Sequence, residues 1–122
     1  GEVDRHALRE SLAVLERGEV LGLAPEGTRA GESHALQEGK AGAAYVATRA
    51  DVPIIPVGIA GTEKIKRDLL RLRRPRVQVT IGEPFHLPES GHVRSEKLRT
   101  YTDMIMRHIA ELLPEAYRGV YA

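Results

Sequence analysis

Apolar residues recur at helical spacing in three segments of the chain. In residues 4–17 an apolar stripe follows a capping Asp4 and stops at Gly18. Residues 95–113 carry a longer stripe, and residues 40–49 hold small side chains that would let a helix pack closely on a sheet. The first stripe consists of Ala7, Leu8, Leu12 and Leu15, and the last of Leu98, Tyr101, Ile105, Ile109 and Leu112. We predict a helix in each segment.

Three shorter apolar segments predict strands. Residues 20–24 form an apolar run that stops at Pro25, which has no N–H group to offer a sheet. Residues 52–59 form a second run, and residues 77–81 alternate between apolar and polar side chains up to Gly82. Helical and strand patterns therefore alternate along the chain. This order favours an α/β fold in which helices flank a mainly parallel sheet with right-handed crossovers.

The composition is that of a globular domain. A chain of 122 residues is one domain or part of one, and its 42% hydrophobic and 29% charged residues exclude a disordered chain. The absence of cysteine excludes disulfides and thiolate metal sites. The longest nearly apolar run, residues 52–62, is about half of what a bilayer span requires. We expect neither a bound metal ion nor a cofactor.

Positive charge is concentrated in one segment. The whole chain has a net charge of +1, but residues 63–76 contain seven basic and two acidic side chains, a net charge of +5. Ile65, Leu69 and Leu72 recur at helical spacing among them. The pattern is typical of a solvated charged face over a core stripe, or of a basic amphipathic helix on an anionic membrane surface. A nucleic acid partner is disfavoured, because one Phe and no Trp leave little for base stacking.

The densest polar motif follows the first predicted strand and reads Pro-Glu-Gly-Thr-Arg. Arg29 offers a planar fork of donors that fits a phosphate, and Gly27 leaves room for a ligand beside the backbone. Glu26 can accept from Arg29 and set its direction. In parallel sheets, ligands bind beyond the carboxyl ends of strands, where this motif is expected to lie. An ordinary strand-to-loop turn with a surface Glu–Arg pair explains the same residues.

With the later motif Val-Pro-Ile-Ile-Pro-Val at residues 52–57, this stretch resembles the third and fourth sequence blocks of the glycerolipid acyltransferases. Val3-Asp4-Arg5 is similar to the end of the second block, and residues 112–121 are similar to the ending of bacterial members. The nearest resemblance is to the bacterial 1-acylglycerol-3-phosphate (lysophosphatidic acid) O-acyltransferases. The resemblance implies a glycerol-3-phosphate acyltransferase-like α/β fold.

The first block of that family, His-x4-Asp, has no counterpart here, because none of the five histidines is followed by Asp five positions later. The resemblance implies that this block, with the catalytic base, lies upstream of Gly1. Residues 1–122 are then the C-terminal part of a single acyltransferase domain whose N-terminal portion is missing, and this chain alone is inactive. His6 lacks a spaced carboxylate partner and is interpreted as a surface residue of the first helix.

The resemblance also implies roles for individual residues. Arg5 and Arg29 would hold the phosphate of the acceptor, and Lys40 would add charge at a helix N-terminus, although Arg5 and Lys40 are equally explained as surface charges. Glu26 and Thr28 would shape the loop, and Gly27 would let the substrate approach. Pro53, Ile54 and Pro56 would form part of an acyl pocket or a buried core strand.

The implied reaction moves a fatty acyl group from acyl-CoA or acyl carrier protein to the free hydroxyl of 1-acylglycerol-3-phosphate, a step of phospholipid biosynthesis. The expected partners are a lysophospholipid, an acyl thioester and an anionic membrane surface. The expected location is the cytoplasmic face of a membrane, either peripheral or anchored through an N-terminal segment upstream. The alternative is a non-catalytic phospholipid-binding or basic interaction module.

Overall fold

The computed structural model describes residues 2–26, 35–36 and 38–122. Its α-helices and strands are α1 (Glu2–Glu16), α2 (Gly42–Ala50), β1 (Val57–Ala60), α3 (Ile65–Leu70), β2 (Gln78–Ile81) and α4 (Ser95–Glu111). Three short 3-10 helices are η1 (Thr62–Lys64), η2 (Glu115–Tyr117) and η3 (Gly119–Tyr121). The predicted helices at 4–17, 40–49 and 95–113 are confirmed with small changes at their ends. One such change is that α1 begins at Glu2, which places Asp4 inside the helix.

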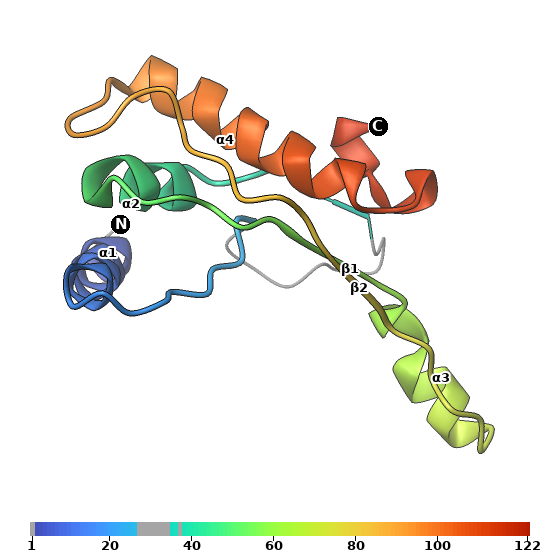
Figure 1. The fold of residues 1–122 in the computed structure, drawn as a ribbon. Coiled ribbons are helices and arrows are strands. Elements are labelled where there is room, and N and C mark those ends of the chain that lie inside the picture. Colours follow the sequence, from blue (N-terminus) through green and yellow to red (C-terminus); the bar gives the residue numbers. More distant parts are fainter. Residues whose placement is uncertain (1, 27–34, 37) are drawn as a thin grey trace.

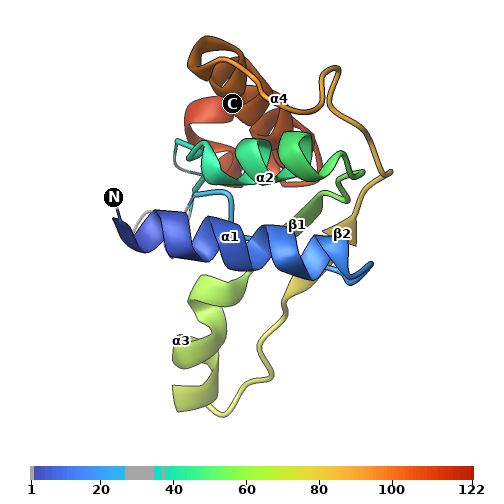
Figure 2. The same cartoon turned by 90° about the vertical axis from the view of Figure 1, so that its left-hand side faces the viewer.

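Three helices form the body of the molecule. Figure 1 and Figure 2 show α2 lying between α1 and α4. Ala44 and Ala47 of α2 are buried against Tyr101 and Ile105 of α4. The small side chains therefore give close packing, as expected, but against a helix rather than a sheet. Leu87 and Val93, from the segment before α4, close the same core.

The sheet differs from the prediction, because its two strands are antiparallel. Val57 lies opposite Ile81 and Ala60 lies opposite Gln78. A parallel pair needs a connection that crosses the sheet to return the chain to the same end. The connection here folds back on itself instead, since α3 has only six residues and leads away from the body (Figure 1). The expectation of a mainly parallel sheet is therefore wrong for the part of the chain that the structure describes.

The predicted strand at residues 20–24 is also absent, and this segment has no regular secondary structure. Val20 is 93% exposed and Leu23 is 49% exposed. A strand needs a neighbour to accept and donate its ladder hydrogen bonds. No described strand pairs with this segment. Its apolar pattern predicts burial, but the described residues do not cover it.

The two faces of the sheet have different surroundings. Gly58 and Ala60 point into the body, where a Cβ on Gly58 would lie 2.9 Å from Cβ of Leu112 at the end of α4. The opposite face is apolar and exposed, and its residues form the cross-strand pairs Val57–Ile81 and Ile59–Val79. Among the residues that the structure describes, the sheet is thus anchored to α4 on one face.

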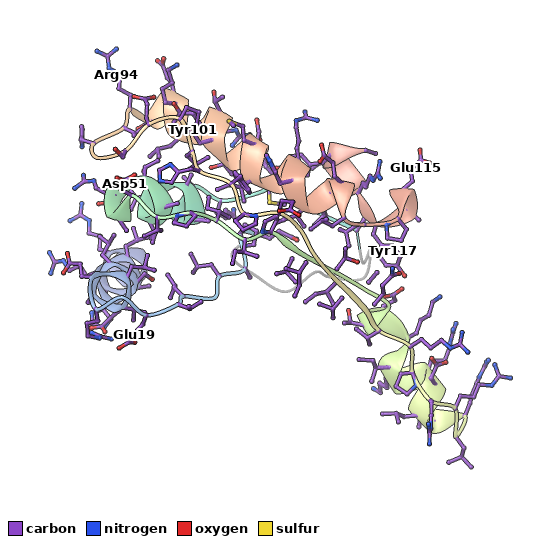
Figure 3. The ribbon with its side chains drawn as sticks, viewed as in Figure 1. Glu19, Asp51, Arg94, Tyr101, Glu115 and Tyr117 are labelled. Carbon is purple, nitrogen blue, oxygen red and sulfur yellow. The ribbon has the colours of Figure 1, made fainter. Side chains whose placement is uncertain are left out.

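Residues 61–77, which we call the arm, leave the sheet between β1 and β2. The arm begins at Gly61, whose φ of +96° suits glycine. Near this base the Tyr117 hydroxyl donates a hydrogen bond to the Glu63 carboxylate, and that bond raises the pKa of Tyr117 (Figure 3). The base of the arm is therefore fixed to the C-terminal segment.

Replacing Gly61 with Ala should destabilise the fold. The new Cβ would overlap the carbonyl oxygen of Arg76 and would sit at a positive φ. We expect the free energy of unfolding to fall by about 1–3 kcal/mol in urea denaturation. Gly22→Ala is the matched control, because nothing lies within 4 Å of its Cβ position. Equal stability of the two variants would contradict this account of the arm's base.

A histidine ties the end of α2 to the segment after β2. Nε2 of His86 lies 3.0 Å from Oδ1 of Asp51, and Nδ1 lies 2.9 Å from the Leu87 carbonyl oxygen. Both ring nitrogens donate only when the ring is protonated. The Leu87 carbonyl first, and then the Asp51 carboxylate, raise the pKa of His86 above its ordinary value of 6.5. The protonated ring is therefore favoured in the folded state.

This raised pKa predicts how stability depends on pH. The stabilisation is complete below the unfolded pKa of about 6.5 and is lost as pH rises through the folded pKa. His86→Ala should therefore lower the free energy of unfolding more at pH 5.5 than at pH 8.5. In an Asp51→Asn background the pH-dependent part should shrink. A His86→Ala effect that is the same at both pH values would rule out this linkage.

Candidate functional site

The start of the Pro-Glu-Gly-Thr-Arg motif lies against the segment that leads into α2. The Lys40 N–H donates a hydrogen bond to the Pro25 carbonyl oxygen at 2.7 Å. Pro25 and Glu26 form a turn, and both are half-buried. The motif was expected beyond the end of a strand, which is wrong here because residues 20–24 form none. The predicted site residues Gly27, Thr28 and Arg29 lie outside the described residues, so their roles stay predictions.

The N-terminal end of α2 favours negative charge. Aligned peptide dipoles give a helix N-terminus a partial positive charge, and its first N–H groups lack partners within the helix. Ala41 at the N-cap makes no side-chain cap hydrogen bond to them. Lys40, whose side chain is exposed, adds a full charge next to these groups.

The first helix brings Arg5 to the same side of the molecule. Leu8 of α1 lies beside α2, with its Cδ2 atom 3.9 Å from the position of a Cβ on Gly42. Arg5 is exposed and lies about one turn before Leu8. Figure 2 shows that α1 and α2 begin on the same side. We call the group formed by Arg5, Lys40 and the Pro25–Glu26 turn the cationic corner. Its two basic side chains are of the kind that bind phosphate, and the predicted roles of Arg5 and Lys40 stay predictions.

Gly39 fixes the corner to the body, and the sequence analysis did not identify it. Its N–H donates to the Tyr121 hydroxyl at 2.9 Å. A Cβ on Gly39 would lie 2.7 Å from Cγ of Met106 and 2.9 Å from Cγ2 of Thr102, both buried on α4. Only glycine therefore allows the segment before α2 to lie this close to α4. The available signal was a glycine directly before a candidate binding lysine.

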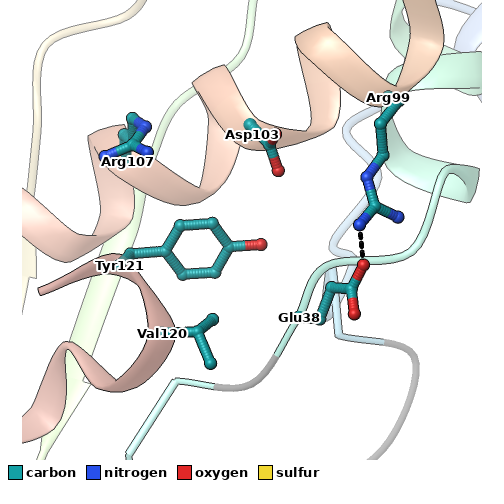
Figure 4. A pocket seen from close by; sticks show the side chains of 6 residues that line it. All are labelled: Glu38, Arg99, Asp103, Arg107, Val120 and Tyr121. Carbon is teal, nitrogen blue, oxygen red and sulfur yellow. Dashed lines mark hydrogen bonds and ion pairs between the residues drawn. The ribbon is translucent and has the colours of Figure 1, made fainter. Parts of the chain in front are cut away.

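A polar hollow of about 270 Å³ lies beside Gly39 (Figure 4). Arg99 of α4 forms an ion pair with Glu38 across it. The complete lining is Glu38, Arg99, Asp103, Arg107, Val120 and Tyr121. Arg99, Asp103 and Arg107 recur every four positions on α4. This spacing could have indicated one charged helix face from the sequence. The hollow therefore offers both signs of charge next to the cationic corner.

The second predicted group of site residues occupies the segment before β1. Pro53 is exposed and Pro56 is buried. Ile54 packs against the core cluster and exchanges backbone hydrogen bonds of 2.7 and 2.9 Å with Phe85. The Pro56 carbonyl oxygen accepts a hydrogen bond from the Gly82 N–H at 2.9 Å. These contacts give Ile54 and Pro56 a structural role, and their part in an acyl pocket stays a prediction.

A histidine–carboxylate pair exists, but it is distant from the cationic corner. His86 and Asp51 meet at the C-terminal end of α2, whereas Lys40 precedes its N-terminal end. Nine helical residues at 1.5 Å each separate the two ends by about 13 Å. His6 is exposed and lies 4.0 Å from Glu10 on its own helix, as expected of a surface histidine. The His86–Asp51 pair is therefore not placed to act at the corner.

Two features are absent from the part of the chain that the structure describes. Among residues 2–26, 35–36 and 38–122, no group of three or more His, Asp or Glu side chains could hold a metal ion. Within the same residues, no helix has the length and apolar character needed to cross a bilayer.

Comparison with known proteins agrees with the resemblance of the sequence motifs. Residues 2–60 match the family model described as Acyltransferase. The chain is also similar to the 1-acyl-sn-glycerol-3-phosphate acyltransferase of Bacillus subtilis (strain 168), with 29% identity over 107 residues. That alignment covers 87% of this chain and 51% of the relative, so the chain spans about half the relative's length. No solved structure gives a significant match. Residues 2–60, which contain the cationic corner, are thus similar to the Acyltransferase family.

Proposed function

We propose that the protein carrying this chain transfers a fatty acyl group from a thioester to the free hydroxyl of 1-acylglycerol-3-phosphate. The observation that carries the proposal is the hydrogen bond from the Lys40 N–H to the Pro25 carbonyl, which holds the start of the Pro-Glu-Gly-Thr-Arg motif at the N-terminus of α2. The distant relationship to the Bacillus subtilis enzyme supports the choice of acceptor.

In this proposal the cationic corner binds the phosphate of the acceptor. The N–H groups of α2 and the charges of Lys40 and Arg5 attract the phosphate, and Arg29 adds a bidentate contact. Glu26 and Thr28 set the shape of the loop, and Gly27 lets the substrate approach its backbone. Fixing the phosphate lowers the entropic cost of bringing the acceptor hydroxyl to the thioester.

The chemical step needs a base that this chain does not contain in the family's pattern. The hydroxyl oxygen attacks the thioester carbonyl carbon, the C–S bond breaks, and the thiol leaves. A base must remove the hydroxyl proton for the attack to proceed. We assign that base to a His-x4-Asp block upstream of Gly1, and the donor to acyl-CoA or acyl carrier protein. The reaction needs no further cofactor, and we place it at the cytoplasmic face of a membrane.

A turnover assay tests this division of roles. We expect this chain alone to leave acyl-CoA intact in the presence of 1-acylglycerol-3-phosphate. The same chain extended upstream to include His-x4-Asp should release free thiol, which a thiol reagent detects. Turnover by the chain alone would show that the base is not upstream. Binding of the lysophospholipid by the extended protein without thiol release would favour the alternative of a phospholipid-binding module.

The role of Arg29 is tested by a substitution that keeps its charge. Arg29→Lys in the extended protein loses the bidentate geometry and should lower kcat/KM for the acceptor by roughly 10- to 150-fold, or about 1.5–3 kcal/mol. Arg94→Lys is the matched control, because Arg94 is exposed and directly precedes α4 (Figure 3). It follows Gly91, whose N–H bonds to the Thr48 carbonyl near the C-terminal end of α2, whereas the cationic corner lies at the N-terminal end. If Arg29→Lys and Arg29→Ala both have the same kcat/KM as the control variant, Arg29 does not bind the acceptor.

A further inference from the structure

The arm presents leucines to solvent. Leu69 is 58% exposed, Leu70 is 77% exposed and Leu72 is 96% exposed. None of the six residues of α3 is buried within the part of the chain that the structure describes. The reading of residues 63–76 as a charged face over a core stripe is therefore wrong for Leu69 and Leu72. The arm instead extends away from the body in both Figure 1 and Figure 2.

The end of α3 adds a second observation. Leu72 has a φ of +56°, a left-handed conformation that glycine normally adopts at this position after a helix. The Arg73 N–H bonds to the Asp68 carbonyl at 2.7 Å, and the Leu72 N–H bonds to the Leu69 carbonyl at 3.1 Å. A large apolar side chain here carries backbone strain and gains almost no burial within the described chain. A surface outside the described chain that covers Leu72 would offset that strain.

Basic side chains accompany these leucines along the arm, and Figure 3 shows nitrogen-tipped side chains around the far part of α3. The exposed cations of the arm are Lys64, Lys66, Arg67, Arg71, Arg73, Arg74 and Arg76. The two acidic residues of the arm make contacts of their own. Asp68 is half-buried and lies 3.8 Å from Nε of Arg67, and Glu63 accepts the hydrogen bond from Tyr117 at the base. The outward charge of the arm is therefore positive.

We propose that the arm docks on an anionic bilayer, with Leu70 and Leu72 inserted among the acyl chains and the arginines on the lipid headgroups. Leucines ringed by cations match a surface that is negative outside and apolar beneath. Nucleic acid would offer the charge but no apolar layer, and the arm has no aromatic side chain for base stacking. The proposal is independent of the transferase activity, because vesicle binding requires no turnover.

Vesicle co-sedimentation of the protein carrying this chain tests the charge. Vesicles of phosphatidylglycerol mixed into phosphatidylcholine are compared with phosphatidylcholine alone, at low and high salt. Each basic residue near an anionic leaflet contributes about fivefold to binding, so replacing Arg71, Arg73 and Arg74 with Gln should weaken it by up to roughly 100-fold at low salt. High salt should reduce that difference.

The control variant replaces Arg9, Arg94 and Lys97 with Gln, which removes the same charge from exposed positions elsewhere. Equal weakening by both variants would overturn the proposal.

A site-specific probe tests insertion. Because the chain contains no cysteine, Leu70→Cys can be labelled uniquely with an environment-sensitive fluorophore. The expected result is a blue shift on anionic vesicles and none on neutral vesicles. Val120→Cys is the matched control, because Val120 is 68% exposed on η3, outside the arm, and its label should not shift.

Three results of this experiment would overturn the proposal, and the second and third each identify a different partner of the arm. No shift at position 70 on anionic vesicles would show that the leucines do not insert. A probe that is already blue-shifted without vesicles would show that another part of the protein, or a second copy, covers the arm. A shift with RNA but none with vesicles would assign the arm to nucleic acid.

Discussion

The close approach of three backbone segments to α4 is the constraint on which the rest of the structure depends. Each approach occurs at a glycine. Gly39 lies against Met106 and Thr102, whereas Gly58 and Gly82 lie against Leu112. At each glycine a Cβ would come within 3 Å of a neighbouring side chain. Protein interiors are packed as densely as organic crystals, so these contacts cannot be relieved by small shifts.

This constraint links the fold to the candidate site. α4 has one buried face, and along it the segment before α2 and the sheet are both positioned by glycine contacts. The hydrogen bond from Gly39 to Tyr121 joins residues 82 positions apart and holds the C-terminal segment over the same face. α4 thus holds the backbone segment that carries Lys40, while the side chains of Lys40 and Arg5 remain exposed to solvent. The groups predicted to bind are exposed, and the groups that position Lys40 are buried.

The helices could be predicted from the sequence because their signal is local. The apolar stripes of residues 4–17 and 95–113 repeat within a few residues, and α1 and α4 appear where those stripes lie. The direction of strand pairing could not be predicted in this way, since it depends on where the arm takes the chain. The run at residues 20–24 shows the same limit, because an apolar pattern indicates burial but does not identify the partner. The exposed Val57–Ile81 and Ile59–Val79 pairs are a second case of apolar residues without a described partner.

The candidate site was predicted by residue type and not by position. A glycine, a carboxylate and an arginine fork in sequence indicated anion binding, but the place of Pro25, the first residue of this motif, beside Lys40 is known only from their hydrogen bond. Gly39 and Tyr121 were missed because each acts through a contact distant in the sequence. A residue whose function is chemical can be recognised from its neighbours along the chain. A residue whose function is to position another requires the fold.

The uneven distribution of charge along the chain favours one orientation of the arm relative to an anionic surface. The arm carries +5 in a chain whose net charge is +1, so the remaining residues together carry −4. An anionic surface therefore attracts the arm more strongly than the other residues of this chain taken together. Because exposed charges are screened beyond about 8 Å at physiological ionic strength, this preference acts only at close range. At that range the arm reaches the surface first, and the most exposed leucines of the molecule arrive together with its densest positive charge. Charge then orients the molecule, and apolar contact holds it.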